Sequence, residues 1–188
     1  STPLYSSAAS DVYKRQRLAG VSDIDSTNDS VIKTAMKRLP WLIILTFLGM
    51  ITATILGSFE DTLSKVALLA AFIPIISGMS GNSGTQSLAV SVRNISTGDI
   101  DEQSKFKVAL REAGSGLLSG IVCSIILIII IISIYRQPLL AVIVGGSLTC
   151  AMTVGTLVGS MIPLLMNKLK IDPAVASGPF ITTINDIV

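Results

Sequence analysis

The sequence predicts an all-α integral membrane protein with five transmembrane helices. Half of its 188 residues are hydrophobic and only 14% are charged, which leaves too little polar surface for a water-soluble domain. The apolar residues gather in long runs of the length that a helix needs to cross a bilayer. Lys and Arg concentrate in alternate connecting segments, as expected of a chain that crosses a membrane repeatedly.

Two segments precede the apolar runs. Residues 1–30 are mostly polar and contain no run long enough for a span, so we expect a flexible N-terminal segment. Residues 31–39 place apolar side chains such as Val31 and Met36 on one helical face and basic ones such as Lys37 on the other. This pattern predicts a short amphipathic helix beside the membrane, on its cytoplasmic side.

Five apolar runs make up the predicted transmembrane domain, residues 40–188. Pro40 preorganises the first helix start, and Trp41 places an indole where such rings anchor at the headgroups. The last run is short for a full crossing, and we expect its helix to be truncated by the end of the chain. The predicted spans are residues 41–59, 66–92, 114–135, 139–166 and 173–188, with a polar loop over 93–111.

Two pairs of glycines stand at GxxxG spacing. They are Gly116 with Gly120 in the third span, and Gly155 with Gly159 in the fourth. Residues without side chains at this spacing let two helix backbones approach closely. We therefore expect both spans to make close helix contacts through these glycines.

The distribution of Lys and Arg predicts the orientation of the chain. Nine of these residues, from Lys33 to Lys170, fall on one side of the predicted membrane, and only Lys65 and Arg136 fall on the other. Because cytoplasmic loops retain positive charge, we expect the N-terminus in the cytoplasm and the C-terminus outside. An even number of spans would break this segregation.

Composition argues against two classes of function. The net charge of +2 and the aromatic content of 5% give neither the basic surface nor the stacking platform of a protein that binds nucleic acid. The sequence has no histidine, the usual general base and the commonest zinc ligand. We therefore expect no enzyme, and polar chemistry that relies on oxygen atoms.

Asp186 is an acidic residue well inside a predicted span, roughly 20 Å along a helix from Pro173 at about 1.5 Å per residue. A carboxylate at that depth costs on the order of 3 kcal/mol unless it meets water, a partner or an ion. Residues on the same helical face are small or carry hydroxyls: Thr183, Thr182, Pro179 and Gly178. The pattern predicts a polar groove leading to a cation-binding carboxylate, with Thr182 and Thr183 beside it. The alternative is a solvated helix end.

The second span carries a matching polar surface. Gly78, Asn82, Thr85, Gln86 and Ala89 share one helical face, and Ser80, Ser83, Ser87 and Ser91 share another. A helix of this composition does not suit lipid. We expect Asn82 and Gln86 to reach an aqueous path, and the alternative is tight helix packing through the small residues.

Four further acidic residues are candidates near the membrane surface. Glu60 and Asp61 fall on the predicted outer side, where they would concentrate cations at a pore mouth or simply belong to a solvated loop. Asp25 and Asp29 precede the amphipathic helix on the predicted cytoplasmic side, where they would bind a divalent ion that controls gating.

Three motifs stand in order along the predicted spans. Residues 38–42 read RLPWL, residues 78–87 read GMSGNSGTQS, and residues 177–186 read SGPFITTIND after DPA at 172–174. Together they resemble the membrane domain of the MgtE family of magnesium channels and transporters. The resemblance runs from about Arg17 to the end of the chain. Residues 1–16 resemble nothing in the family, and we expect them to be non-native.

The resemblance implies a homodimer in the inner membrane, with five helices per subunit and the pore at the two-fold axis. Helices two and five would line this pore, and Asp186 of both subunits would bind hydrated Mg²⁺, the transported ion. The family also implies cytosolic Mg²⁺-sensing domains, which lie outside these 188 residues. The predicted pore-lining residues are Asn82, Gln86, Thr85, Gly78, Gly178, Pro179 and Asn185.

Two other functions stay open. Asp186 would equally serve a secondary transporter that couples cation movement to protons or Na⁺. A non-conducting membrane anchor for cytosolic domains is the second alternative. Flux driven by a Mg²⁺ gradient alone separates a channel from both.

Overall fold

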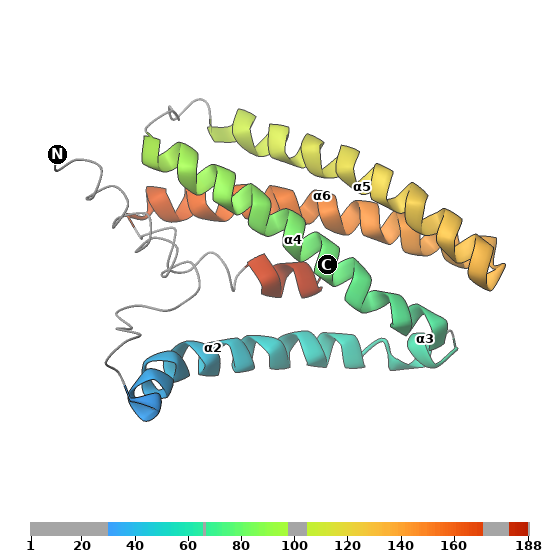
Figure 1. Ribbon diagram of the computed structural model, residues 1–188, viewed down its shortest axis with the longest axis horizontal. Coiled ribbons are helices and arrows are strands. Elements are labelled where there is room, and N and C mark those ends of the chain that lie inside the picture. Colours follow the sequence, from blue (N-terminus) through green and yellow to red (C-terminus); the bar gives the residue numbers. More distant parts are fainter. Residues whose placement is uncertain (1–29, 66, 98–104, 171–180, 188) are drawn as a thin grey trace.

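The computed structural model describes residues 30–65, 67–97, 105–170 and 181–187, and every regular element in these ranges is a helix (Figure 1). The helices are α2 (Val31–Gly57), α3 (Glu60–Lys65), α4 (Ala67–Thr97), α5 (Lys105–Tyr135) and α6 (Pro138–Lys168), followed by a helical segment at residues 181–187. The predicted all-α class is confirmed. Residues 1–29, and with them Asp25 and Asp29, lie outside the described residues.

Within the described ranges, three helices, α4, α5 and α6, are long and apolar enough to cross a membrane. Helix α2 is bent by 44° between Val31–Pro40 and Leu42–Gly57, and its two parts add a fourth crossing if they form one span. The bend follows from Pro40, which removes a backbone hydrogen bond inside the helix. The segment 181–187 falls within the fifth predicted span, of which residues 173–180 lie outside the described ranges. Five crossings therefore stay a prediction.

Part of the predicted polar loop, residues 93–111, is helical. Helix α4 continues to Thr97 and α5 begins at Lys105, so polar residues extend both helices beyond the apolar runs. The physical reason is that a helix forms its backbone hydrogen bonds with polar side chains as well as with apolar ones. Apolar side chains are needed only where the helix is in contact with lipid. Apolar runs therefore mark where lipid begins, and they do not mark where a helix ends.

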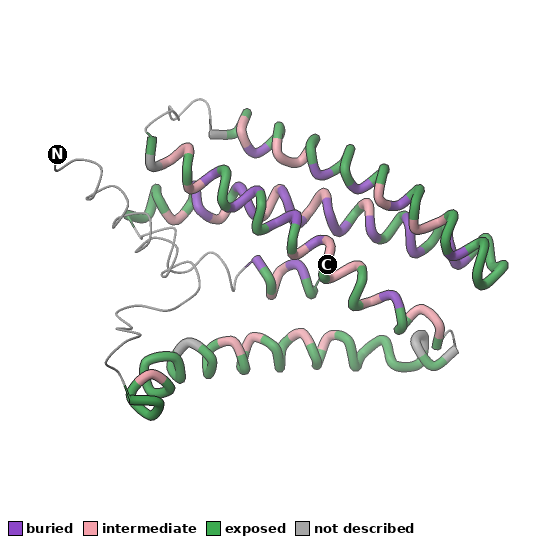
Figure 2. Tube along the Cα trace, viewed as in Figure 1, coloured by how far each residue is buried: buried purple, intermediate pink, exposed green. Residues whose placement is uncertain are grey.

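Helix α6 lies between α4 and α5, which have little direct contact with each other (Figure 1). Figure 2 shows buried positions gathered along α6 and along the side of α4 that faces it, whereas α2 is exposed over most of its length. At one end of the bundle the contact is apolar, and the Phe72 ring meets Tyr135 edge-on with centroids 5.8 Å apart. The buried members of this cluster are Phe72, Ile131, Leu140, Ala141 and Val144.

Farther along α6, the contact with α4 is made by glycines and hydroxyl groups. A Cβ atom on Gly159 would lie only 2.2 Å from the carbonyl oxygen of Gly84, and one on Gly155 would lie 2.8 Å from that of Ser80. On the other side of α6, a Cβ atom on Gly116 of α5 would meet Thr156 at 2.0 Å. The predicted close contacts through the GxxxG glycines are confirmed, and they bring α4 and α6 near enough for side-chain hydroxyls to reach the opposite backbone.

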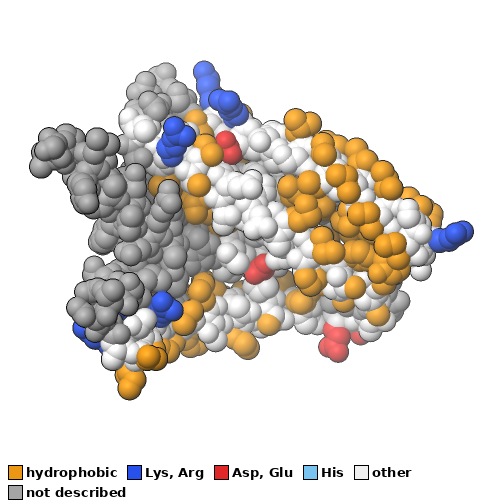
Figure 3. All heavy atoms as spheres, viewed as in Figure 1, with side chains coloured by type: hydrophobic (Ala, Val, Ile, Leu, Met, Phe, Trp, Pro, Cys, Tyr) orange, Lys and Arg blue, Asp and Glu red, His pale blue; other side chains and the backbone are white. Residues whose placement is uncertain are grey.

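The outward-facing surfaces of α2 and α5 are apolar, as lipid requires. Exposed side chains include Phe47 and Met50 on α2 and a row of isoleucines on α5. Thr46 and Thr54 donate their hydroxyls to backbone carbonyls one turn earlier, both at 2.8 Å, which satisfies these polar groups without water. Figure 3 shows hydrophobic side chains gathered toward the right of this face and Lys and Arg side chains near both ends. Its middle is mostly uncharged polar groups and backbone, with a few acidic side chains among them.

Candidate cation-binding site

The segment 181–187 packs antiparallel to α4. Its last turn pairs Asp186 with Ser77, whereas Ile181 at its start meets Gly84, farther along α4. Ile181 is fully buried, and its Cγ2 atom fills the space that a side chain on Gly84 would need, 2.9 Å from the position of a Cβ atom there. The missing side chain of Gly84 therefore makes room for the segment as well as for α6.

Asn185, one turn after Ile181, occupies the same buried face. Its Nδ2 donates to the carbonyl oxygen of Ser77 at 3.2 Å, and its Oδ1 accepts from the hydroxyl of Ser80. The Ser80 hydroxyl also lies 2.6 Å from the carbonyl oxygen of Ala151 on α6, so its single proton is shared between two acceptors. Asn185 is only 6% exposed, and this network joins the segment to both α4 and α6.

Asp186 and Thr182, which stands one turn earlier, lie on an adjacent face of the segment and are exposed. The hydroxyl of Ser77 donates to Oδ1 of Asp186 at 2.6 Å, the short distance expected of a hydrogen bond to a carboxylate. Thr183 is half-buried. Successive residues therefore have opposite tasks, because Asn185 anchors the segment and Asp186 presents a charge.

The two polar faces of α4 differ in burial. Gly78, Asn82, Thr85, Gln86 and Ala89 are exposed, while Ser80, Ser83, Ser87 and Ser91 are buried. Ser87 shows what the buried face does, because its hydroxyl donates to the carbonyl oxygen of Thr156 on α6 at 2.8 Å. The exposed polar face of α4 and the exposed face of residues 181–187 meet where Ser77 contacts Asp186.

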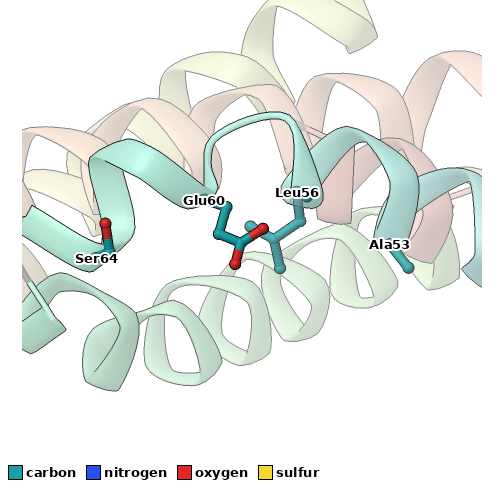
Figure 4. Close-up of a pocket in the computed structure, with 5 residues that line it drawn as sticks. Ala53, Leu56, Glu60 and Ser64 are labelled. Atoms are coloured by element: carbon teal, nitrogen blue, oxygen red, sulfur yellow. The ribbon is translucent and has the colours of Figure 1, made fainter.

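The remaining predicted site residues lie elsewhere or are not described. Glu60 and Asp61 are exposed in the first turn of α3, at the connection between α2 and α4. Glu60 contributes to an open hollow of about 460 Å³ together with Ala53, Leu56, Gly57 and Ser64 (Figure 4). Gly178 and Pro179 lie outside the described residues.

Sequence reasoning missed the roles of Ser77 and Ser80, and it placed Asn185 on the pore surface, whereas the structure buries this residue. The sequence contains one signal for the burial of Asn185. Asn185 stands four residues after Ile181, so both share one helical face, and a polar side chain on an otherwise apolar packing face needs a partner. The buried serines of α4 are the natural donors.

The donor atoms at this site are oxygens. Asp186 offers a carboxylate, and Ser77 and Thr182 offer hydroxyls, which are the ligand types that hard divalent cations and their bound water prefer. Among the described residues, no three carboxylate, thiol or imidazole side chains come together.

Comparison with known proteins identifies the family. The family model MgtE, described as a divalent cation transporter, matches residues 73–188, which include most of α4, all of α5 and α6, and the segment with Asp186. The chain belongs to the MgtE family. Membership makes it a membrane protein, and the description of the family is that of a transporter rather than of an enzyme.

Three curated relatives, each described as magnesium transporter MgtE, support this assignment. The Enterococcus faecalis protein is 46% identical over 171 residues, covering 90% of this chain and 37% of its own length. The Bacillus subtilis protein is 45% identical over 154 residues, 82% of this chain and 34% of its own length. The Thermus thermophilus protein is 35% identical over 186 residues, 98% of this chain and 40% of its own length. The chain therefore spans between a third and two fifths of these MgtE proteins.

The Asn185 network yields a stability prediction. Asn185→Leu keeps a side chain of similar size but removes both hydrogen bonds to α4, so we expect a loss of about 1 kcal/mol and a lower thermal midpoint in detergent. Ser133→Ala is the matched control, because the Ser133 hydroxyl bonds only within its own helix, to the carbonyl oxygen of Ile129. Equal midpoints for the two variants would contradict an anchoring role for Asn185.

Proposed function

We propose that this chain is the membrane domain of a magnesium channel, in which hydrated Mg²⁺ passes along a path lined by α4 and the segment 181–187. Asp186 is the ion-binding carboxylate. The observation that supports this proposal is that Asp186 is exposed beside the polar face of α4, on a segment whose other face is buried. The chain that carries it belongs to the MgtE family. The magnesium transporters among its relatives supply the identity of the ion.

The chemistry of Asp186 suits a hydrated ion. Mg²⁺ requires near-ideal octahedral geometry and gives up its water reluctantly, so a site with one carboxylate and neutral oxygens fits it better than a cage of charged ligands. Thr182 and Thr183 follow the same segment, and Asn82, Thr85 and Gln86 follow α4. Their hydroxyl and amide groups accept and donate hydrogen bonds to ion-bound water.

A homodimer completes the path. In a single chain the polar face of α4 is exposed, and Asn82 and Gln86 on it are costly against lipid. A second copy related by a two-fold axis covers this face and brings a second Asp186 to the same ion. The start of α2, the end of α4, the start of α5 and the end of α6 lie toward the same side of the molecule (Figure 1). These helix portions carry basic residues, Lys37, Arg93, Arg111 and Lys168, which supports an N-terminus in the cytoplasm and a C-terminus outside the inner membrane. Glu60 and Asp61 then stand at the outer mouth.

Liposomes test this function against its rivals. The purified chain, with its helicity verified by circular dichroism, is reconstituted around a Mg²⁺-sensitive dye, and an inward Mg²⁺ gradient is applied without Na⁺ and with equal pH on both sides. We expect flux well above that of empty liposomes, sustained when protonophores dissipate any pH change. Flux that appears only with a proton or Na⁺ gradient identifies a coupled transporter, and liposomes that stay tight identify a membrane anchor.

A further inference from the structure

The contact between Ser77 and Asp186 is one half of a two-point clamp. Ser77 uses its hydroxyl to hold Oδ1 of Asp186 at 2.6 Å and its backbone carbonyl to hold Nδ2 of Asn185 at 3.2 Å. One residue of α4 thus binds two consecutive side chains of the segment 181–187. Because Asn185 is itself buried and bonded to Ser80, the clamp fixes where the carboxylate stands and which of its oxygens is occupied.

We propose that Ser77 determines ion specificity by making Asp186 a one-oxygen ligand, which favours hydrated Mg²⁺ over Ca²⁺. This inference rests on the proposed function, in which Asp186 binds the ion. Ser77 acts through Asp186 as a positioning residue. Its hydroxyl engages Oδ1, so Oδ2 is the less engaged oxygen and the better one for the ion or for the water around it.

Mg²⁺ and Ca²⁺ differ in how many oxygens of one carboxylate they bind. Mg²⁺ keeps several waters in a rigid octahedron and meets a carboxylate through one oxygen, directly or through water. Ca²⁺ accepts six to eight ligands in flexible geometry and commonly binds both oxygens of one carboxylate. Two-oxygen binding at Asp186 places the ion against an oxygen that already accepts from Ser77, so the cation and the hydroxyl proton compete for Oδ1. A hydrogen bond to a charged group is worth about a tenfold change in an equilibrium constant or more, and weakening it lowers the affinity for such an ion. Ca²⁺ bound to both oxygens weakens the Ser77 hydrogen bond, whereas hydrated Mg²⁺ bound to one oxygen leaves it intact.

The anchoring of Asn185 keeps the clamp from adapting. An Asp side chain on a loosely held helix end would rotate to offer both oxygens and would lose only a solvent contact. Here the neighbouring residue is 6% exposed and bonded on two sides, which holds the backbone of the segment beside Ser77. The specificity therefore resides in the Ser77 hydroxyl and in the buried network that holds the backbone beneath it.

Three variants in liposomes test the inference, with Mg²⁺ and Ca²⁺ flux measured at equal concentrations. Ser77→Ala removes the hydroxyl, and we expect the ratio of Mg²⁺ to Ca²⁺ flux to fall about tenfold. Ser77→Thr restores a hydroxyl, and we expect the wild-type ratio. Ser87→Ala is the control, because it removes a buried hydroxyl from the same helix, one that bonds to Thr156 and not to the segment.

A ratio that Ser77→Ala leaves unchanged overturns the inference, whatever happens to the total flux, since a purely structural role lowers both fluxes together. A Ser87→Ala ratio that falls as far as that of Ser77→Ala also overturns it. Failure of the proposed function gives a different result, because Mg²⁺ flux then persists after the Asp186 carboxylate itself is removed.

Discussion

Asp186→Ala will reduce Mg²⁺ flux into liposomes by about tenfold or more, and Asp186→Asn will do nearly the same. Asn matches the size of Asp and still accepts the Ser77 hydrogen bond, so it leaves the packing of the segment 181–187 intact and removes only the charge. The expected loss follows from the charge-assisted contacts between a carboxylate and ion-bound water, each worth about 1.5–3 kcal/mol. Equal loss in both variants assigns the effect to charge.

The matched control for this experiment is Glu112→Ala. Glu112 is an acidic residue on α5, and its removal changes the net charge of the chain by the same amount. We expect flux within a factor of about two of the wild type, because Glu112 lies on α5, outside the contact between α4 and Asp186, and salt screens the field of a single charge. Undiminished Mg²⁺ flux in Asp186→Asn would remove Asp186 from the conduction path.

The parts of the site that depend on one helix were predictable from the sequence. Ser80, Ser87 and Asn82 follow the 3.6-residue period of α4, so their division between two faces could be derived before any packing was known. The close contact at Gly159 followed in the same way from its spacing to Gly155. Each of these inferences needs only local geometry and the rule that small residues pack against helices.

The parts that depend on two distant segments were not predictable. Asn185 and Ser77 are 108 residues apart in the chain, and nothing in either neighbourhood specifies that they meet. Whether Asn185 faces a pore or a helix depends on the rotation of the segment 181–187, which Ile181 fixes by filling the space above Gly84. Side-chain spacing defines the faces of a helix, but only docking decides which face is buried.

Gly159→Ala will destabilise the protein by about 3 kcal/mol, at the upper end of the usual range for overpacked cores. The added methyl would lie 2.2 Å from the carbonyl oxygen of Gly84, and backbone atoms of two helices cannot move aside as a flexible side chain does. Relief therefore requires α4 and α6 to separate. That separation would also weaken the hydrogen bond from Ser87 to the carbonyl oxygen of Thr156 and disturb the seat of Ile181 on Gly84.

Thermal unfolding in detergent measures this effect, with Gly146→Ala as the control. Gly146 lies in the same helix and its added methyl would meet nothing within 4 Å, so we expect a midpoint equal to or above that of the wild type, because Ala favours a helix over Gly by up to about 1 kcal/mol. A Gly159→Ala midpoint as high as that of Gly146→Ala would mean that α4 and α6 do not touch at Gly84. Since Asp186 is held in place through α4, the loss of this contact should lower Mg²⁺ flux in parallel with stability, while Gly146→Ala preserves both.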